Sequence, residues 1–277
     1  MFPEYSHIRN GVNTLGPMCR YAADIRPMLK VLAGDNLSLP EEAPLNISNL
    51  NVHYLHQLDD PMVSPVDKEI IGAINKTIKY LGERGAHIYK LDTERKFADM
   101  KNTFQIWSAA MHDPDHRLFI DFLTDGKRQE MNPYWELFKC ALKLQKKYTA
   151  SVMMFALSEE LGLWRANIDA NKEMWQRIKA DFHQLLGPNG VLIAPTMPES
   201  AMKHNESLSK FSSFQFTSLF SALNVAVTNV PMGLDRKSMP IGIQVIATAK
   251  NDNLSIQVAE ALEGHFGGWV PPCEIKL

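Results

Sequence analysis

Lys210 and the adjacent pair Ser212 and Ser213 are the residues whose types best suit nucleophilic catalysis. A catalytic serine needs a nearby base and backbone N–H groups that converge on the developing oxyanion. Such donors usually come from a tight, glycine-rich turn, yet no glycine lies between Gly190 and Gly233. We therefore interpret this stretch as a polar loop before a helix, with Ser213 as a candidate cap. A hydrolase that uses one of these serines is kept as an alternative.

Two histidine pairs have spacings that suggest metal binding. His112 and His116 stand four residues apart, which suits two ligands on one helix face. Pro114 between them disfavours a helix, so a solvated loop is the better interpretation. His53 and His56 are three residues apart in an expected strand, so their side chains should leave on opposite faces. The sequence therefore predicts no metal site.

The common catalytic and nucleotide-binding motifs are also missing from the sequence. Gly-x-Ser-x-Gly, phosphate-cradling loops and the dinucleotide fingerprint do not occur. From the residues alone we assign no catalytic residue and expect no cofactor.

Composition is typical of a globular protein with a large core. The chain has 277 residues, of which 45% are hydrophobic and 22% charged, enough for one large domain or two small ones. A formal net charge of -2 gives no basic field, so we expect no nucleic-acid partner. Three widely scattered cysteines favour reduced thiols over a disulfide framework.

Targeting signals are not visible in this sequence. The first residues lack a basic stretch followed by an apolar one, so we expect no secretory signal peptide. No segment reaches the ~20 apolar residues that a membrane-spanning helix needs. We therefore expect an intracellular protein, either cytoplasmic or peripherally bound to a membrane.

Apolar periodicity predicts an α/β protein with four successive parts. The span 1–34 ends in a lead-in helix that Gly34 would cap. A strand, a helix and a strand at 50–92 predict a βαβ unit. Residues 95–186 read as a long helical insertion, and 187–277 supply the terminal strands and a helix. One face of the lead-in helix carries Tyr21, Ile25, Met28, Leu29 and Leu32.

The strands expected at 225–231 and 241–248 are apolar at nearly every position. This pattern predicts central strands that helices cover on both faces. The closing helix should begin at Asp252 as its N-cap. Its buried stripe should consist of Leu254, Val258, Leu262 and Phe266.

The stretch 132–157 combines basic and aromatic residues in an amphipathic pattern. Such a segment can rest in a membrane interface, which makes peripheral membrane contact one interpretation. An ordinary packed helix with lysines in water is the other and favoured one. The residues concerned are Trp135, Phe138, Leu142, Met153, Met154 and Phe155 with Lys139, Lys143, Lys146 and Lys147.

Several segments together resemble the amidase-signature family. LGPMCRYAADIRPMLKVLAG is similar to a helix-opening segment of these enzymes, and VLIAPTMPESA to one of their loops. The stretch from LFSALNVAVTNVPMG to MPIGIQVIATAKNDNLSIQVAEALE is similar to their terminal strand, turn, strand and helix. GPMCRYA and FGGWVPP bring the resemblance nearest to fatty-acid amide hydrolases of the type 2 branch. It implies a partial amidase-type fold, with a mixed central sheet flanked by helices and a long helical insertion.

The resemblance also implies which parts of the chemistry to expect. Family members cleave amides with a lysine, a bridging serine and a nucleophilic serine, which precede the Gly-Pro-Met segment. Only 15 residues precede Gly16 here, so we expect these groups and the oxyanion loop to have no counterpart. By analogy, an acyl-binding channel would be lined by Thr196, Met197, Phe214, Phe216, Phe220, Ile241 and Gln244.

Two function hypotheses follow. The first is the C-terminal half or a short form of a fatty-acid-amide-hydrolase-like amidase, which carries the substrate-channel side and is inactive alone. Its ligand would be an amide or ester with an apolar acyl group. The second is a non-catalytic protein that binds lipids or partners, as a monomer or a homodimer. A sheet cut at its middle would expose strand edges, so aggregation on expression would count against this second hypothesis.

Overall fold

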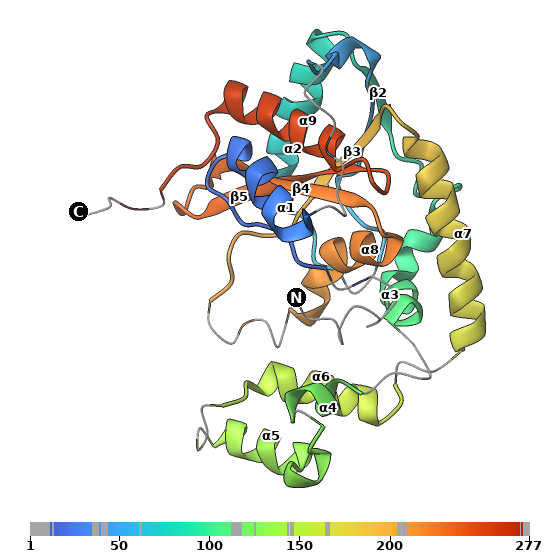
Figure 1. Cartoon of the computed structure of the whole chain (residues 1–277), viewed down its shortest axis with the longest axis vertical. Helices are drawn as coiled ribbons and strands as arrows, with labels where there is room; N and C mark the ends of the chain where they lie inside the picture. The colour runs from blue at the N-terminus through green and yellow to red at the C-terminus, as the bar shows by residue number, and fades with distance from the viewer. Residues whose placement is uncertain are drawn as a thin grey trace.

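The structure is a computed structural model in which apolar strands form the centre and helices surround them (Figure 1). It describes residues 12, 14–34, 39, 44–60, 63–111, 118–124, 126–142, 144, 147–163, 167–203, 206, 210–271 and 273. The strands are β1 (Asn51–Tyr54), β2 (His87–Lys90), β3 (Gly190–Pro195), β4 (Ala226–Leu234) and β5 (Pro240–Ala247). The helices are α1 (Ile25–Ala33), α2 (Lys68–Glu83), α3 (Thr103–Met111), α4 (Phe119–Leu123), α5 (Pro133–Ala141), α6 (Ala150–Glu160), α7 (Ile168–Leu186), α8 (Gln215–Leu223) and α9 (Asp252–Phe266).

The five strands form one mixed sheet in the order β2-β1-β3-β5-β4. β1 pairs in parallel with both β2 and β3, and α2 crosses from β1 to β2. β5 runs antiparallel to β3 and to β4. The predicted α/β class with a mixed sheet flanked by helices is therefore confirmed.

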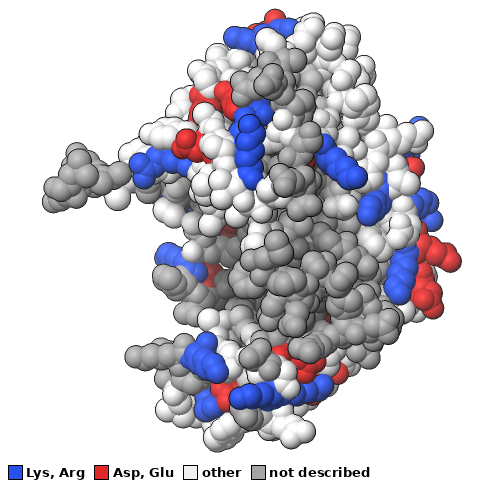
Figure 2. All heavy atoms as spheres, viewed as in Figure 1, with Lys and Arg blue, Asp and Glu red and all other residues white. Residues whose placement is uncertain are grey.

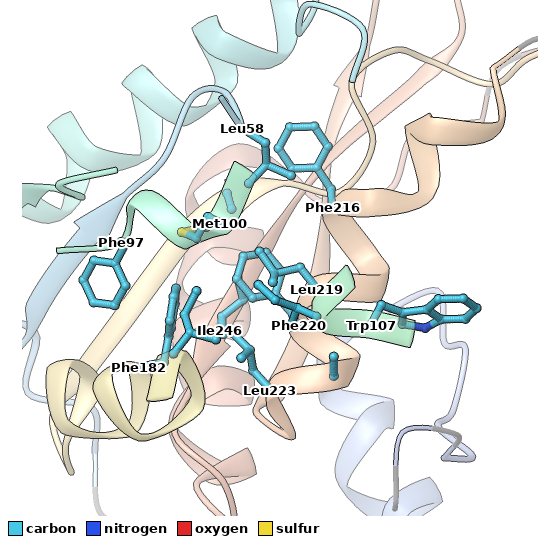
Figure 3. Close-up of a cluster of buried hydrophobic side chains, with 14 of the residues drawn as sticks. Leu58, Phe97, Met100, Trp107, Phe182, Phe216, Leu219, Phe220, Leu223 and Ile246 are labelled. Atoms are coloured by element: carbon cyan, nitrogen blue, oxygen red, sulfur yellow. The ribbon is translucent and has the colours of Figure 1, made fainter. Parts of the chain in front are cut away.

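Two hydrophobic clusters cover opposite faces of the sheet because successive side chains of a strand alternate between faces. Leu192 and Ala194 of β3 belong to the cluster beneath α3, α7 and α8, which Figure 3 shows. Val191 and Ile193 belong to the cluster beneath α2 and α9. β3 is buried along its whole length, which explains its continuous apolar sequence.

The prediction that both terminal strands are central is wrong for β4. β5 lies between β3 and β4, whereas β4 forms an edge of the sheet. From Ala226 to Val230 of β4 buried and exposed residues alternate, and Val227 is 42% exposed. α9 packs on one face of this strand, and its other face is open around Val227 and Asn229. The apolar sequence of β4 did not reveal how many neighbouring strands it has in the sheet.

The helical span divides into two structural parts. α3 and α7 belong to the main core, where Phe182 of α7 contacts Phe97 and Phe220. α4, α5 and α6 form a separate lobe, drawn below the main body in Figure 1. This lobe has a small core of its own, formed by Ile120, Met131, Met153 and Ala156.

Two expected helix caps are absent. Asp252 is the first residue of α9, and Asn251 before it occupies the N-cap position without a side-chain cap bond. Ser213 lies inside a 3-10 turn, η8 (Phe211–Phe214), and Phe214 precedes α8 at the N-cap position. Gly34 does end α1, with a φ of 54° that favours glycine.

Candidate functional site

A cavity of about 410 Å³ lies at the carboxyl end of β3. We call it the β3-end cavity. Ligands of open α/β sheets typically bind beyond the carboxyl ends of strands, which makes its position informative. Its walls come from the loop after β3, from β4 and from the start of β5. The lining residues are Cys19, Ile70, Thr196, Met197, Glu199, Ser200, Ala201, Met202, Asn229, Pro231, Pro240, Ile241, Gly242 and Trp269.

Polar bonds from several elements fix the loop that follows β3. The backbone N–H of Asp67, before α2, donates to the carbonyl of Pro198 at 2.8 Å. The hydroxyl of Thr196 donates to the side-chain carbonyl of Asn229 on β4. These contacts attach the loop to β4 and to the segment before α2.

Charged groups hold the outer part of the same loop. Lys210 forms an ion pair with Glu199, and this hydrogen bond raises the pKa of Lys210 above its usual value. The backbone N–H of Met239 lowers the pKa of Asp235, and the Ser200 side chain adds to this effect. Asp235 therefore stays ionised at neutral pH beside the loop.

The cavity is suited to an apolar group with a polar end. Met197, Met202, Ile241 and Trp269 supply much of its apolar wall, and thioethers adapt to irregular ligands. Thr196, Glu199, Ser200 and Asn229 supply polar atoms from the same lining. This mixture of mostly apolar walls and a few polar groups is typical of small-molecule sites.

Three of the seven predicted channel residues meet at the β3-end cavity. Thr196, Met197 and Ile241 line it. Gln244 lies deeper in β5 and is 2% exposed, where it donates to the carbonyl of Pro195 at 2.7 Å. It also donates to the carbonyl of Phe216 at 3.2 Å, so it joins α8 to β3.

The three predicted phenylalanines do not line this cavity. Phe216 and Phe220 are buried in the core cluster of Figure 3. Phe214 is half-buried and packs edge to face on Trp107, with ring centroids 5.7 Å apart. An acyl-contact role for these residues stays a prediction.

Sequence reasoning missed several cavity residues. Asn229 is a polar residue within an apolar strand, which was the available signal. Trp269 follows a glycine pair after the last helix, and Glu199 has no local signal because its partner Lys210 is distant in sequence. Cys19 reaches the cavity from the start of the chain.

Lys210 and Ser213 are not arranged as a base with its nucleophile. Lys210 pairs with Glu199. Ser213 is completely buried, and within the described residues its hydroxyl oxygen has no hydrogen-bond partner. Neither arrangement supplies an activated hydroxyl that a substrate can reach.

Other side chains of the protein contact His53 and His56. Burial lowers the pKa of His53, and the charge of Lys96 adds to this shift. His53 stacks on Tyr89 with ring centroids 5.4 Å apart, whereas His56 contacts Asn75 at 2.9 Å. His112 and His116 lie outside the described residues. In the part of the chain that the structure describes, no group of three or more His, Cys, Asp or Glu side chains could hold a metal ion.

Comparison with known proteins decides the family. The amidase family model matches residues 3–255. This chain belongs to the amidase family. It is 35% identical to human fatty-acid amide hydrolase 2 over 265 residues, which cover 93% of this chain and 49% of that protein. It is 32% identical to fatty-acid amide hydrolase 2-B of Danio rerio, over 98% of this chain and 52% of that protein.

Solved amidase structures share the fold of this amidase-family chain. A fatty acid amide hydrolase matches with a TM-score of 0.60 at 12% identity, over 94% of this chain and 49% of the other. A bacterial aryl acylamidase of the amidase signature family matches with a TM-score of 0.59 at 18% identity, over 90% of this chain and 52% of the other. This chain thus spans about half the length of the relatives it matches.

Proposed function

We propose that this amidase-family chain forms the acyl-group side of a hydrolase that cleaves amides or esters with apolar acyl groups. The observation that carries the proposal is the β3-end cavity, whose Met197, Ile241 and Trp269 offer apolar surface beside a few polar atoms. The similarity to fatty-acid amide hydrolase 2 supports an apolar acyl group. The volume of the β3-end cavity, about 410 Å³, lies within the range of ~300–1,000 Å³ that is usual for small-molecule sites.

The chain's own part in this reaction is binding and orientation. Apolar burial contributes ~25 cal/mol for each Å² of acyl surface removed from water. Thr196 and Asn229 already bond to each other, and their polar atoms lie in the cavity wall where a carbonyl or amide group can contact them. The chain would therefore select the acyl group and fix its direction.

Bond cleavage would use groups outside these 277 residues, in the same polypeptide or another. We expect the lysine and two serines that the family resemblance implies to have no counterpart in these 277 residues. Loss of a nucleophile and its base typically lowers turnover ~10⁶-fold. The 277-residue chain alone should therefore bind an acyl amide without cleaving it.

A peripheral membrane contact through 132–157 is the second part of the proposal. α5 exposes Tyr134, Trp135 and Phe138, and Asn132 caps its N-terminus through two backbone N–H groups. Figure 2 shows both basic and acidic side chains on the surface of the lobe that contains this helix. Aromatic and basic side chains together suit a membrane interface. In the described part of the chain no helix is long and apolar enough to span a bilayer.

The cellular setting that fits this proposal is a reducing one. Cys19, Cys140 and Cys273 are not linked by disulfides. Reduced thiols are usual in intracellular proteins. This favours the cytoplasm or the cytoplasmic face of a membrane.

The test is equilibrium binding of a fluorescent long-chain fatty amide to the purified chain. Ile241→Asp puts a carboxylate in the apolar wall, and we expect it to weaken binding at least ~10-fold because a desolvated charge is costly. Leu161→Asp is the matched control, since Leu161 is 56% exposed and belongs to the helical lobe. Equal affinities of the two variants, or no binding by the unaltered chain, would refute the proposal.

A further inference from the structure

Glu199, which lines the β3-end cavity, has one carboxylate oxygen in use and one without a partner. Its Oε2 atom accepts the hydrogen bond from the ammonium group of Lys210. Its Oε1 atom is buried from solvent and has no hydrogen-bond partner among the described residues. Buried polar atoms nearly always have a partner, and an orphaned one costs free energy. A ligand that brings a hydrogen-bond donor to Oε1 would remove that cost.

Asn229 supplies the complementary group, a donor, from β4. Its side-chain oxygen accepts the hydrogen bond from the Thr196 hydroxyl. Among the described residues this is the only side-chain hydrogen bond of Asn229, so both N–H groups of its Nδ2 atom are left to donate. Because the amide group is planar, the bond to Thr196 also fixes the direction of these N–H groups. Asn229 lines the cavity and therefore presents donors to a ligand.

Two hydroxyl groups of the lining have already used their protons. The Thr196 proton goes to Asn229. The side chain of Ser200 forms a hydrogen bond with the carboxylate of Asp235, which can only accept. Both hydroxyl oxygens therefore keep lone pairs and have no proton to give to a ligand. The cavity thus offers the donors of Asn229 together with the acceptor of Glu199.

We infer that Glu199 and Asn229 determine specificity by recognising the amide group of the ligand. Asn229 donates to the carbonyl oxygen of that group, and Glu199 accepts from its N–H. This inference rests on the proposed function and narrows it, because amides are then preferred over esters with the same apolar acyl group. An ester has the carbonyl but no N–H, so it would fill the cavity and leave Oε1 of Glu199 without a partner.

A purely structural role is the alternative for Glu199. In that case its ion pair with Lys210 would only hold the loop after β3, and the loss of either partner would have the same effect. The side chains of this pair are 22% and 34% exposed, and ion pairs in contact with water contribute little to stability. The two roles therefore differ in what replacement of Lys210 should do.

The experiment is equilibrium binding of two nearly isosteric ligands to the purified chain. They are the N-methyl amide and the methyl ester of the same long-chain fatty acid, which differ in the N–H group that an ester oxygen replaces. We expect the amide to bind at least ~10-fold more tightly, since a site built to bond an N–H rejects the analogue that lacks it. The ratio of the two dissociation constants is the readout for each variant.

Glu199→Gln tests the acceptor without changing the shape of the side chain. The ammonium of Lys210 can only donate, so it would hold the glutamine oxygen and leave the –NH₂ group at the position of Oε1. We expect the ratio to fall below ~2, because the ligand N–H would then face a donor. Lys210→Gln is the matched control. It removes the ion pair and keeps Oε1, so we expect the ratio to stay at ~10 or more.

Asn229→Leu tests the donor with a spectroscopic readout. We expect both ligands to bind more weakly by a similar factor, because both have the carbonyl that Asn229 contacts. The infrared carbonyl band of the bound ester, isolated by ¹³C labelling, should move to higher frequency, since a hydrogen bond weakens the C=O bond. Lost packing alone would lower the affinity and leave this band in place.

The outcomes separate this inference from the proposed function. Equal affinities of the unaltered chain for the amide and the ester would overturn the inference and leave the proposed function standing. An equal fall of the ratio in Glu199→Gln and Lys210→Gln would also overturn it, in favour of the structural role. An unshifted carbonyl band in Asn229→Leu would exclude Asn229 as the donor. Binding of neither ligand would contradict the proposed function itself, and the inference with it.

Discussion

We expect Gln244→Leu to lower the thermal midpoint of the chain while the β3-end cavity keeps its lining residues. Gln244 is 2% exposed and donates to two carbonyls, those of Pro195 at 2.7 Å and Phe216 at 3.2 Å. Leucine cannot donate, so both buried carbonyls lose this partner. This residue was predicted to contact an acyl ligand, and its geometry instead favours a positioning role.

The magnitude follows from the bond to Pro195. Phe216 lies within α8, so its carbonyl keeps a helical N–H partner, and only the Pro195 carbonyl is left unsatisfied. Leaving one buried polar group unsatisfied costs ~1–3 kcal/mol in the free energy of unfolding. For a chain of this size, that corresponds to a decrease of ~2–12 °C in the midpoint.

The assay is a thermal melt followed by circular dichroism, with fatty-amide binding measured below the transition. Gln176→Leu is the control, because Gln176 is exposed on α7 and its replacement should change the free energy by less than ~0.5 kcal/mol. The reasoning is refuted if Gln244→Leu melts with the unaltered chain and loses only ligand affinity.

Three further predictions test the core, a half-buried histidine and the helical lobe. Phe220→Ala should destabilise the chain by ~3–5 kcal/mol in urea unfolding, because Phe220 is 1% exposed in the main core. Burial, with a smaller contribution from Lys179, lowers the pKa of His183, so stability should fall as pH drops below ~6.5, where the unfolded histidine takes up a proton more readily. His183→Gln should flatten that decline, and an unchanged pH profile would contradict the assignment. Trp135→Ser with Phe138→Ser should reduce co-sedimentation with phospholipid vesicles at least ~5-fold, and unchanged sedimentation would exclude α5 from membrane contact.

Local sequence patterns predicted the parts of the fold that depend on local burial. β3 is buried at every position, and its sequence GVLIAP is apolar throughout. α2 repeats its buried residues with helical spacing, and Gly34 ends α1 where its positive φ is needed. In each case the period of apolar residues, or one glycine, contains the required information.

Such local patterns could not predict contacts between segments that are distant in sequence. β4 has an apolar sequence like that of β5, and only the strand order makes it an edge. Lys210 pairs with Glu199 and not with a serine, because the loop after β3 returns to η8. Ser213 failed as a cap because the 3-10 turn buries its side chain.

The candidate site was predicted in part for the same reason. Thr196 and Met197 follow β3 directly. Ile243 pairs with Pro195 at the end of β3, and Ile241 lies two residues farther along β5, so Thr196, Met197 and Ile241 meet at the cavity. Phe216 and Phe220 share an aromatic pattern that suits a channel and a core equally well. Both rings pack in the core against α3 and α7, and their role in acyl contact stays a prediction.

Fatty-amide turnover tests the central claim most directly. It is measured with the purified chain alone and with the chain together with the half of human fatty-acid amide hydrolase 2 that it does not match. We predict no hydrolysis by the 277-residue chain alone. We predict hydrolysis when the two parts are combined, at a rate that Ile241→Asp in the chain lowers. Hydrolysis by the chain alone that is lost on Ser212→Ala or Ser213→Ala would contradict it.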